Sequence, residues 1–101
     1  MEFSNSVKND EMIIFLNGEL DEKSASVTRD YLDGKIKERR YGRIILDFER
    51  VGFMDSTGIG VLLGRYKKIT DNGSELCVRN LNAQIDKVFR ISGLYQIIKA
   101  V

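Results

Sequence analysis

Three short apolar segments, separated by stretches with helical spacing, constrain the fold of this chain more than any other feature. They are MIIFL at residues 12–16, RIILDF at 43–48 and ELCVRN at 75–80. Apolar runs of this length are typical of strands that are buried in a sheet. Residues 3–7 are expected to pair with the first run as an edge strand, and YQIIKAV at 95–101 is expected to form a last strand.

Segments with a helical repeat of apolar residues lie between these runs. The first covers residues 22–39, with Asp21 as its expected N-cap. The second begins in DSTGIG and ends near Thr70, and the third lies between Asn82, an expected cap, and Gly93, an expected terminator. The expected core-facing residues of the three helices are Ala25, Thr28, Leu32 and Ile36; Ile59, Leu62, Leu63, Tyr66 and Ile69; and Ile85, Val88 and Phe89. The order β-β-α-β-α-β-α-β predicts an α/β fold with a mixed, mostly parallel sheet and right-handed crossovers.

The composition excludes several classes of function. Sixteen basic and 15 acidic residues leave a formal charge of +1, whereas a nucleic-acid binder needs a clustered basic face. The chain has no histidine and one cysteine, Cys77, which excludes an internal disulfide, a Ser-His-Asp triad and zinc sites built on His or Cys. No apolar run is long enough for a signal peptide or a membrane span. We therefore expect a cytoplasmic protein that binds neither membranes nor nucleic acid directly.

The segment FMDSTGIGVLLG contains the candidate functional residue, Ser56. Loops at the carboxyl ends of parallel strands lie at one edge of a sheet, so Asp21 and Ser56 are expected to be close, each at the start of a helix. Ser56 is predicted to be the N-cap, a common role of serine. Thr57, Gly58 and Ile59 include no acid, so we expect the positive helix end to be unneutralised. The segment does not fit the known phosphate loops or the nucleophile elbow.

Gly60 and Gly64 lie inside the predicted helix, where each costs roughly 1 kcal/mol relative to alanine. With Lys67 they line the face opposite the predicted apolar stripe, and Val61 lies nearby. Two explanations are open, namely close packing against a strand or a smooth exposed strip for another protein. Because the stripe already supplies a core face, we favour the exposed strip. Gly58 and Gly60 would also clear the approach to the serine hydroxyl.

The segments GELD, FMDSTGIGVLLGRYK and KVFRISGLYQII resemble the three signature blocks of the anti-sigma factor antagonists, bacterial members of the STAS domain family. FMDS followed by GRYK is most similar to the sporulation members of this family, and DSTG and RNLN are similar to its general-stress members. The resemblance implies one STAS domain over residues 1–101, with the helices packed on one side of the sheet. It implies no cofactor and no metal.

The resemblance also implies a mechanism. An unphosphorylated antagonist binds an anti-sigma factor, which is a serine kinase that holds ATP or ADP, and the sigma factor is released. The kinase phosphorylates the serine at position Ser56 and so switches the antagonist off, and a PP2C-type phosphatase restores it. The expected partner-binding residues are Asp21, Asp55, Ser56, Thr57, Gly58, Ile59, Gly60, Val61 and Gly64.

Two other functions are open at this point. The first is a STAS module with another partner, such as a stressosome component, a lipid-transport accessory subunit or a regulatory domain that binds a nucleotide. The second is a small acyl- or phosphoryl-transfer enzyme that uses Ser56. The missing histidine, and the lack of any lysine or glutamate within three residues of Ser56, argue against the enzyme. We therefore predict a regulatory protein.

Overall fold

The chain forms the predicted alternation of strands and helices, with one short helical turn added before the last strand. The computed structural model describes residues 1–101. Its elements are β1 (Glu2–Lys8), β2 (Glu11–Leu20), α1 (Ala25–Glu38), β3 (Arg43–Met54), α2 (Ser56–Asp71), β4 (Glu75–Arg79), α3 (Ala83–Ser92), the turn η1 (Leu94–Gln96) and β5 (Lys99–Ala100). The predicted order of elements is confirmed.

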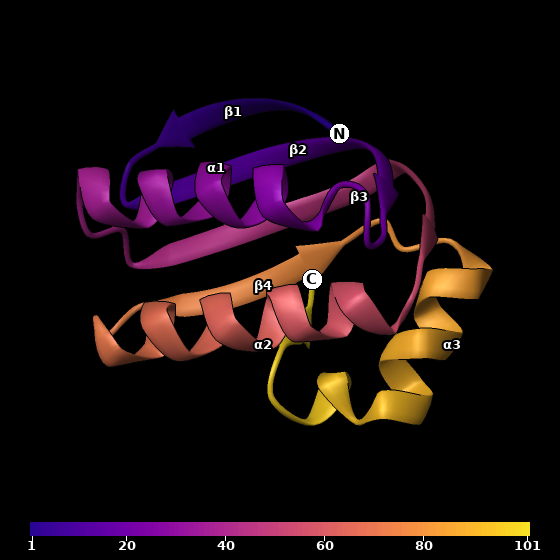
Figure 1. Ribbon diagram of the computed structural model, residues 1–101. Coiled ribbons are helices and arrows are strands. Elements are labelled where there is room, and N and C mark those ends of the chain that lie inside the picture. Colours follow the sequence, from indigo (N-terminus) through magenta and orange to yellow (C-terminus); the bar gives the residue numbers. More distant parts are fainter.

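The five strands form one sheet in the order β1-β2-β3-β4-β5. β1 and β2 are antiparallel, whereas the pairs from β2 to β5 are parallel. Because each parallel connection advances to the next strand in the same direction, crossovers of one hand place their helices on one face. Figure 1 shows α1 and α2 side by side over this face, with α3 beyond the start of α2. The predicted mixed sheet with helices on one side is confirmed.

The core lies between the sheet and the helices. Ile44, Leu46 and Phe48 of β3 point into it, as their alternation predicts, while Ile45 is buried on the opposite face of the sheet. Phe48 meets Phe89 of α3 edge to face, with ring centroids 6.0 Å apart. This contact anchors α3 against the strand that leads to Ser56.

The third helix has the predicted ends. The Asn82 side chain accepts a hydrogen bond from the N–H of Ile85 at 2.9 Å, which satisfies one of the free donors at a helix start. Gly93 ends the helix with a φ of 82°, the left-handed conformation that glycine adopts without strain. Both boundaries were predictable because each depends on one local side chain.

Two strands are longer than predicted and one is shorter. β2 continues to Leu20 and β3 to Met54, so segments expected to be loops pair with each other. The register shifts next to Phe15 and Gly18 mark bulges, and Gly18 has a φ of 137° that side-chain-bearing residues rarely adopt. The turn-forming residues Asn17 and Gly18 are therefore part of a bulged strand. β5 has only two residues, because the turn η1 occupies the chain before it.

The second helix presents a different face to the core than predicted. Its buried residues are Gly58, Val61, Leu62, Arg65 and Ile69. The predicted stripe shares only two members with this set. Ile59 and Tyr66 are half-buried and Leu63 is 43% exposed. The prediction was wrong because Arg65, a charged residue, occupies a core position where the apolar pattern has a gap.

Arg65 is held in the core by Asp33 of α1. The Nε atom of Arg65 lies 3.0 Å from Oδ1 of Asp33, a charge contact that lacks hydrogen-bond geometry, and Nη1 of Arg65 has no hydrogen-bond partner. Nζ of Lys68 lies 3.0 Å from the other oxygen of Asp33. The Arg65 side chain is only 8% exposed. Asp33 therefore neutralises a cation that water reaches poorly, and the pair fixes α1 against α2.

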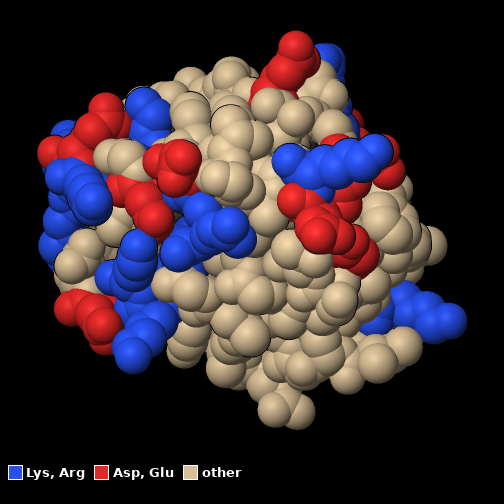
Figure 2. Space-filling view, viewed as in Figure 1, with Lys and Arg blue, Asp and Glu red and all other residues tan.

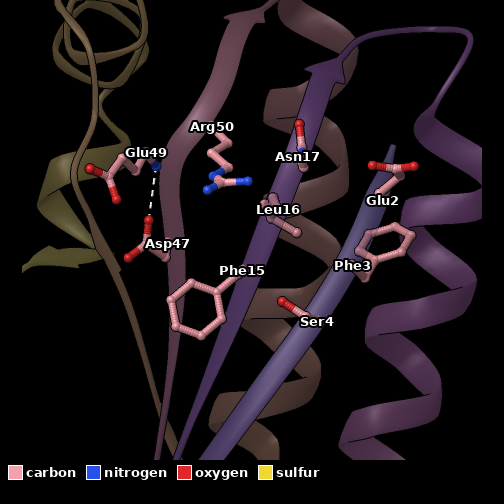
Figure 3. A pocket seen from close by; sticks show the side chains of 9 residues that line it. All are labelled: Glu2, Phe3, Ser4, Phe15, Leu16, Asn17, Asp47, Glu49 and Arg50. Atoms are coloured by element: carbon pink, nitrogen blue, oxygen red, sulfur yellow. Dashed lines mark hydrogen bonds between the residues drawn. The ribbon is translucent and has the colours of Figure 1, made fainter.

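The uncovered face of the sheet is hollowed beside the bulge, with a volume of ≈ 730 Å³. Figure 3 shows the hollow over β2 and β3, with side chains that include Phe15, Asn17, Asp47, Glu49 and Arg50. Burial raises the pKa of Asp47, but hydrogen bonds from the Glu49 N–H and from Arg79 outweigh this and lower the pKa of Asp47 below its ordinary value. Asp47 thus stays a carboxylate, and its hydrogen bond from Arg79 links β3 to β4. The hollow contains none of the predicted site residues.

Candidate functional site

The paired ends of β2 and β3 bring the two predicted loops together. Leu20 lies opposite Met54 in the parallel register, and the N–H of Asp55 donates to the carbonyl oxygen of Leu20 at 3.3 Å. Asp21 and Asp55 each follow directly after these strand ends. The expectation that the Asp21 loop and the start of the Ser56 helix are neighbours therefore agrees with the strand register.

The second helix is capped by Asp55 and not by Ser56. Oδ1 of Asp55 accepts hydrogen bonds from the N–H groups of Thr57 at 2.9 Å and Gly58 at 3.3 Å. Ser56 is the first helical residue and is exposed. The positive end of the helix is thus neutralised by a carboxylate, contrary to the prediction. The error arose because Asp and Ser are both good N-caps and stand side by side.

Asp21 organises a turn and does not cap α1. Its Oδ1 atom accepts from the N–H groups of Lys23 at 3.0 Å and Ser24 at 3.1 Å, and α1 begins only at Ala25. The hydroxyl of Ser24 donates to the carbonyl oxygen of Glu19 at 2.6 Å. These hydrogen bonds hold the Asp21 loop in place, directly after the strand end that pairs with the strand end before Asp55.

The glycines of α2 have two different roles. A Cβ atom on Gly58 would lie 2.5 Å from Cγ of Met54 and 3.0 Å from the carbonyl oxygen of Leu20, so Gly58 lets the helix start pack closely on the strand ends. The expectation that Gly58 clears the approach to the Ser56 hydroxyl is therefore wrong. A Cβ atom on Gly60 or Gly64 would meet nothing within 4 Å. These two glycines do not serve packing, and the exposed-strip explanation agrees with the structure.

The exposed side of α2 combines small and apolar residues. We call it the α2 outer face, and its members are spaced at three or four positions. Ser56, Gly60, Leu63 and Lys67 are exposed, and Ile59 and Gly64 are half-buried. Val61 is only 1% exposed and belongs to the core, which corrects its predicted place on the partner surface. Leu63 was predicted to be in the core and lies outside instead. Leu63 and the half-buried Ile59 thus form an apolar area beside the two glycines, and a contiguous apolar area of this kind marks an interaction surface when it is large.

A hollow of ≈ 470 Å³ extends the α2 outer face toward α3. It is lined by Ile59, Gln84, Lys87, Val88, Ile91 and Ser92, and Ile91 is 74% exposed. Figure 2 shows a broad uncharged area over the first half of α2, while charged side chains gather where α1 and α2 end. No sequence pattern predicts this hollow, because it depends on how two helices meet.

Gln84 is a positioning residue that the sequence pattern does not predict. Its side-chain amide forms two hydrogen bonds with the backbone of Met54, accepting from the N–H at 3.2 Å and donating to the carbonyl oxygen at 3.0 Å. Asn82 adds bonds to the carbonyl oxygens of Val51 and Gly52, both at 3.3 Å. The start of α3 is thus bonded to the strand end that carries Asp55. A long-range amide contact of this kind leaves no pattern in the sequence.

A family model of the STAS domain matches residues 2–101. The chain belongs to the STAS domain family. This STAS chain is 38% identical over 86 residues to an anti-sigma F factor antagonist of Paenibacillus polymyxa, an alignment that spans 85% of this chain and 74% of that protein. It is 37% identical over 100 residues to an anti-sigma-B factor antagonist of Bacillus subtilis (strain 168), over 97% of this chain and 90% of that protein.

Solved structures of the anti-sigma factor antagonist SpoIIAA share this STAS fold. The unphosphorylated form matches with a TM-score of 0.82 at 30% identity, over 99% of this chain and 88% of that one. The phosphorylated form matches with a TM-score of 0.74 at 31% identity, over 99% and 91%. The relatives are regulatory antagonists, which confirms the prediction of a STAS regulatory protein and not an enzyme. No helix of the chain has the length and apolarity to cross a membrane.

Proposed function

We propose that this STAS chain is an anti-sigma factor antagonist that is switched by phosphorylation of Ser56. The observation that carries the proposal is the position of Ser56, which is exposed on the first turn of α2 and heads the α2 outer face. Relatives named as antagonists, and a similar protein with known phosphorylated and unphosphorylated forms, support it. In this proposal the unphosphorylated chain binds an anti-sigma factor, and the sigma factor is released.

The proposed partner is an anti-sigma factor that is also a serine kinase and binds ATP or ADP. Residues 53–59 include no histidine, lysine or glutamate that could activate the Ser56 hydroxyl, and the Asp55 carboxylate is engaged in its cap hydrogen bonds. We therefore assign the catalytic machinery to the partner. A PP2C-type phosphatase would return the chain to its active form. The same surface thus serves as binding site and substrate, which explains why an exposed serine stands at the end of an apolar outer face.

The geometry supports a switch that acts at the surface. Ser56 lies beside Asp55, which is fixed by its cap bonds, and Asp55 follows a strand end paired with the one before Asp21. Phosphorylation adds about −1.5 to −2 charges near pH 7. Two carboxylates and a phosphate then share one small area. A partner that covers this area must either neutralise that charge or lose contact.

Ser56→Ala should remain unmodified by the kinase while keeping its ability to bind it. The substitution removes one hydroxyl from an exposed position, and Thr57 keeps its own hydroxyl as an internal control. The measurement is intact-mass analysis after incubation with ATP and the anti-sigma factor serine kinase of the same organism. We expect one added phosphate on the wild type and none on the variant. A full phosphate signal on Ser56→Ala would move the site to Thr57 or Ser24 and contradict the assignment.

Gly60→Leu should weaken partner binding without weakening the fold. A side chain at Gly60 meets nothing in the free protein, and leucine is the better helix former by less than about 1 kcal/mol. At a covered surface the added side chain would overpack the contact, which we expect to reduce affinity roughly tenfold or more. Urea unfolding and a binding titration separate the two effects.

The matched control is Gly34→Leu. Gly34 is an exposed glycine of α1 whose added Cβ atom would also meet nothing within 4 Å, and it lies outside the proposed surface. We expect this variant to bind as the wild type does. Equal losses of affinity in both variants, or a clear loss of stability in Gly60→Leu alone, would contradict a partner surface on α2.

A further inference from the structure

β1 is an edge strand whose outer side has no partner. The strand pairs with β2 over all seven of its residues, from Glu2 opposite Asn17 to Lys8 opposite Glu11. No strand lies beyond it in the sheet. Figure 1 shows α1 over the inner strands, so that the outer side of β1 is not covered by a helix. A row of backbone N–H and C=O groups is therefore free to pair with another chain.

The edge lacks the usual protection against such pairing. Native edge strands are typically shortened, broken by proline or bulges, or given charges in their centre. The other edge of this sheet, β5, has only two residues. β1 has seven residues, no proline, and charges only at its ends, in Glu2 and Lys8. Its centre consists of Ser4, Asn5 and Ser6, which carry no charge that would repel a second strand.

The sequence of β1, EFSNSVK, is complementary to itself when reversed. We propose that two copies of this chain pair through their β1 strands, antiparallel and centred on Asn5. In this register Glu2 faces Lys8 of the second copy at both ends, Phe3 faces Val7, and Ser4 faces Ser6. Opposite charges and apolar pairs that are directly opposite each other stabilise antiparallel strands. A two-fold axis through the Asn5 pair makes the contact isologous and closed.

The neighbouring registers are less favourable. A pairing centred on Ser4 or on Ser6 would place Asn5 opposite Phe3 or Val7 and would leave Glu2 and Lys8 without each other. A register centred between two residues would oppose side chains that point to different faces, which the pleat does not allow. The charge pairing therefore selects one register.

The faces of the strand also agree with this pairing. Phe3 and Val7 both lie on the helix face, where Phe3 stacks on Tyr31 of α1 with ring centroids 4.1 Å apart. Val7 is 46% exposed in the single chain, and Phe3 of the second copy would cover it. The joined sheet would contain ten strands with the helices of both copies on one side. Neither Ser56 nor the α2 outer face is part of β1, so both sites remain open in the pair.

Charge reversal tests this interface directly. Glu2→Lys places two lysines opposite each other at both ends of the pair, and Lys8→Glu places two glutamates there. Because two end pairs change from attraction to repulsion, we expect the dissociation constant of each variant alone to rise roughly tenfold or more. An equimolar mixture of the two variants restores opposite charges at both ends, and so does the double exchange Glu2→Lys with Lys8→Glu.

Sedimentation velocity over a concentration series into the millimolar range is the measurement, because a seven-residue edge is small for an interface and the pair should be weak. We expect dimers for the wild type, the mixture and the double exchange, and fewer for each single variant. A wild type that stays monomeric throughout, or single variants that dimerise as the wild type does, would overturn the proposal. Unchanged circular dichroism and melting of each variant show that the comparison concerns folded protein.

A crosslink supplies a second readout. With Asn5→Cys the two introduced thiols face each other across the axis, at a Cβ separation of about 5 Å, close to the spacing that a disulfide needs. In the control Lys8→Cys the two thiols are separated by about 20 Å, and the native Cys77 is buried. Mild oxidation should give covalent dimers of Asn5→Cys only. Equal crosslinking of both variants, or of neither, would contradict pairing centred on Asn5.

Discussion

Replacing Asp33 with alanine should lower the free energy of unfolding by about 3 kcal/mol, because the buried Arg65 cation then has no counter-charge. Arg65 is 8% exposed and Asp33 is 21% exposed, so water can compensate only in part. Lys68, the other partner of Asp33, is 49% exposed and can return to solvent. Urea unfolding of the wild type and the variant, followed by circular dichroism, measures the difference.

Arg65→Met is the matched variant for this prediction. It keeps an unbranched side chain of similar length in the core and leaves Asp33 paired with Lys68, so we expect a much smaller loss of stability. Adding Arg65→Met to Asp33→Ala should recover most of the stability, because no buried charge is then left unpaired. A loss below about 1 kcal/mol in Asp33→Ala, of the size typical of exposed ion pairs, would show that the pair is a surface feature.

Phosphorylation of Ser56 should lower affinity for the anti-sigma factor at least roughly a hundredfold, equivalent to about 2.7 kcal/mol, and leave the fold in place. In the free protein the phosphate is exposed, and water and salt screen its repulsion from Asp55 and Asp21. The N–H groups of Thr57 and Gly58 already bond to Asp55, so the helix start offers the phosphate little new hydrogen bonding. A covering partner removes the water that compensates the charge.

Phosphorylation of Ser56 should change the fold very little. Far-UV circular dichroism and the melting temperature of the phosphorylated protein should match those of the unmodified one. Backbone amide shifts should change around Asp21 and from Asp55 to Val61 only. Shift changes throughout the chain, or a large fall in melting temperature, would show that the switch acts by unfolding and not at the surface.

The sequence predicts those parts of this fold that depend on local chemistry. Asn82 and Gly93 bound α3 as expected, because a cap and a left-handed C-terminal residue each act within one turn. The alternation in β3 predicts which side chains enter the core. Ser56 stands out in the sequence because it combines an N-terminal helix position with a run of glycines and no acid after it.

The errors arise where a tertiary contact overrides the local pattern. Arg65 occupies a core position because Asp33, on another helix, neutralises it, and this turns α2 so that Leu63 faces outward. Gly58 is required by the approach of the helix to Leu20, which no pattern within α2 reveals. The sequence predicts Ser56 as the N-cap of α2, one residue after the true cap Asp55, because Asp and Ser are equally good caps and are adjacent here.

The most direct test of the proposed switch is a calorimetric titration of the anti-sigma factor serine kinase, loaded with ADP, with unmodified protein and with protein that is phosphorylated on Ser56. Treating the second sample with a PP2C-type phosphatase and repeating the titration controls for damage during preparation. We predict tight binding of the unmodified chain, at least a roughly hundredfold loss after phosphorylation, and full recovery after dephosphorylation. Equal affinities of the unmodified and the phosphorylated protein for the kinase would contradict the proposed switch, even if the kinase does modify Ser56.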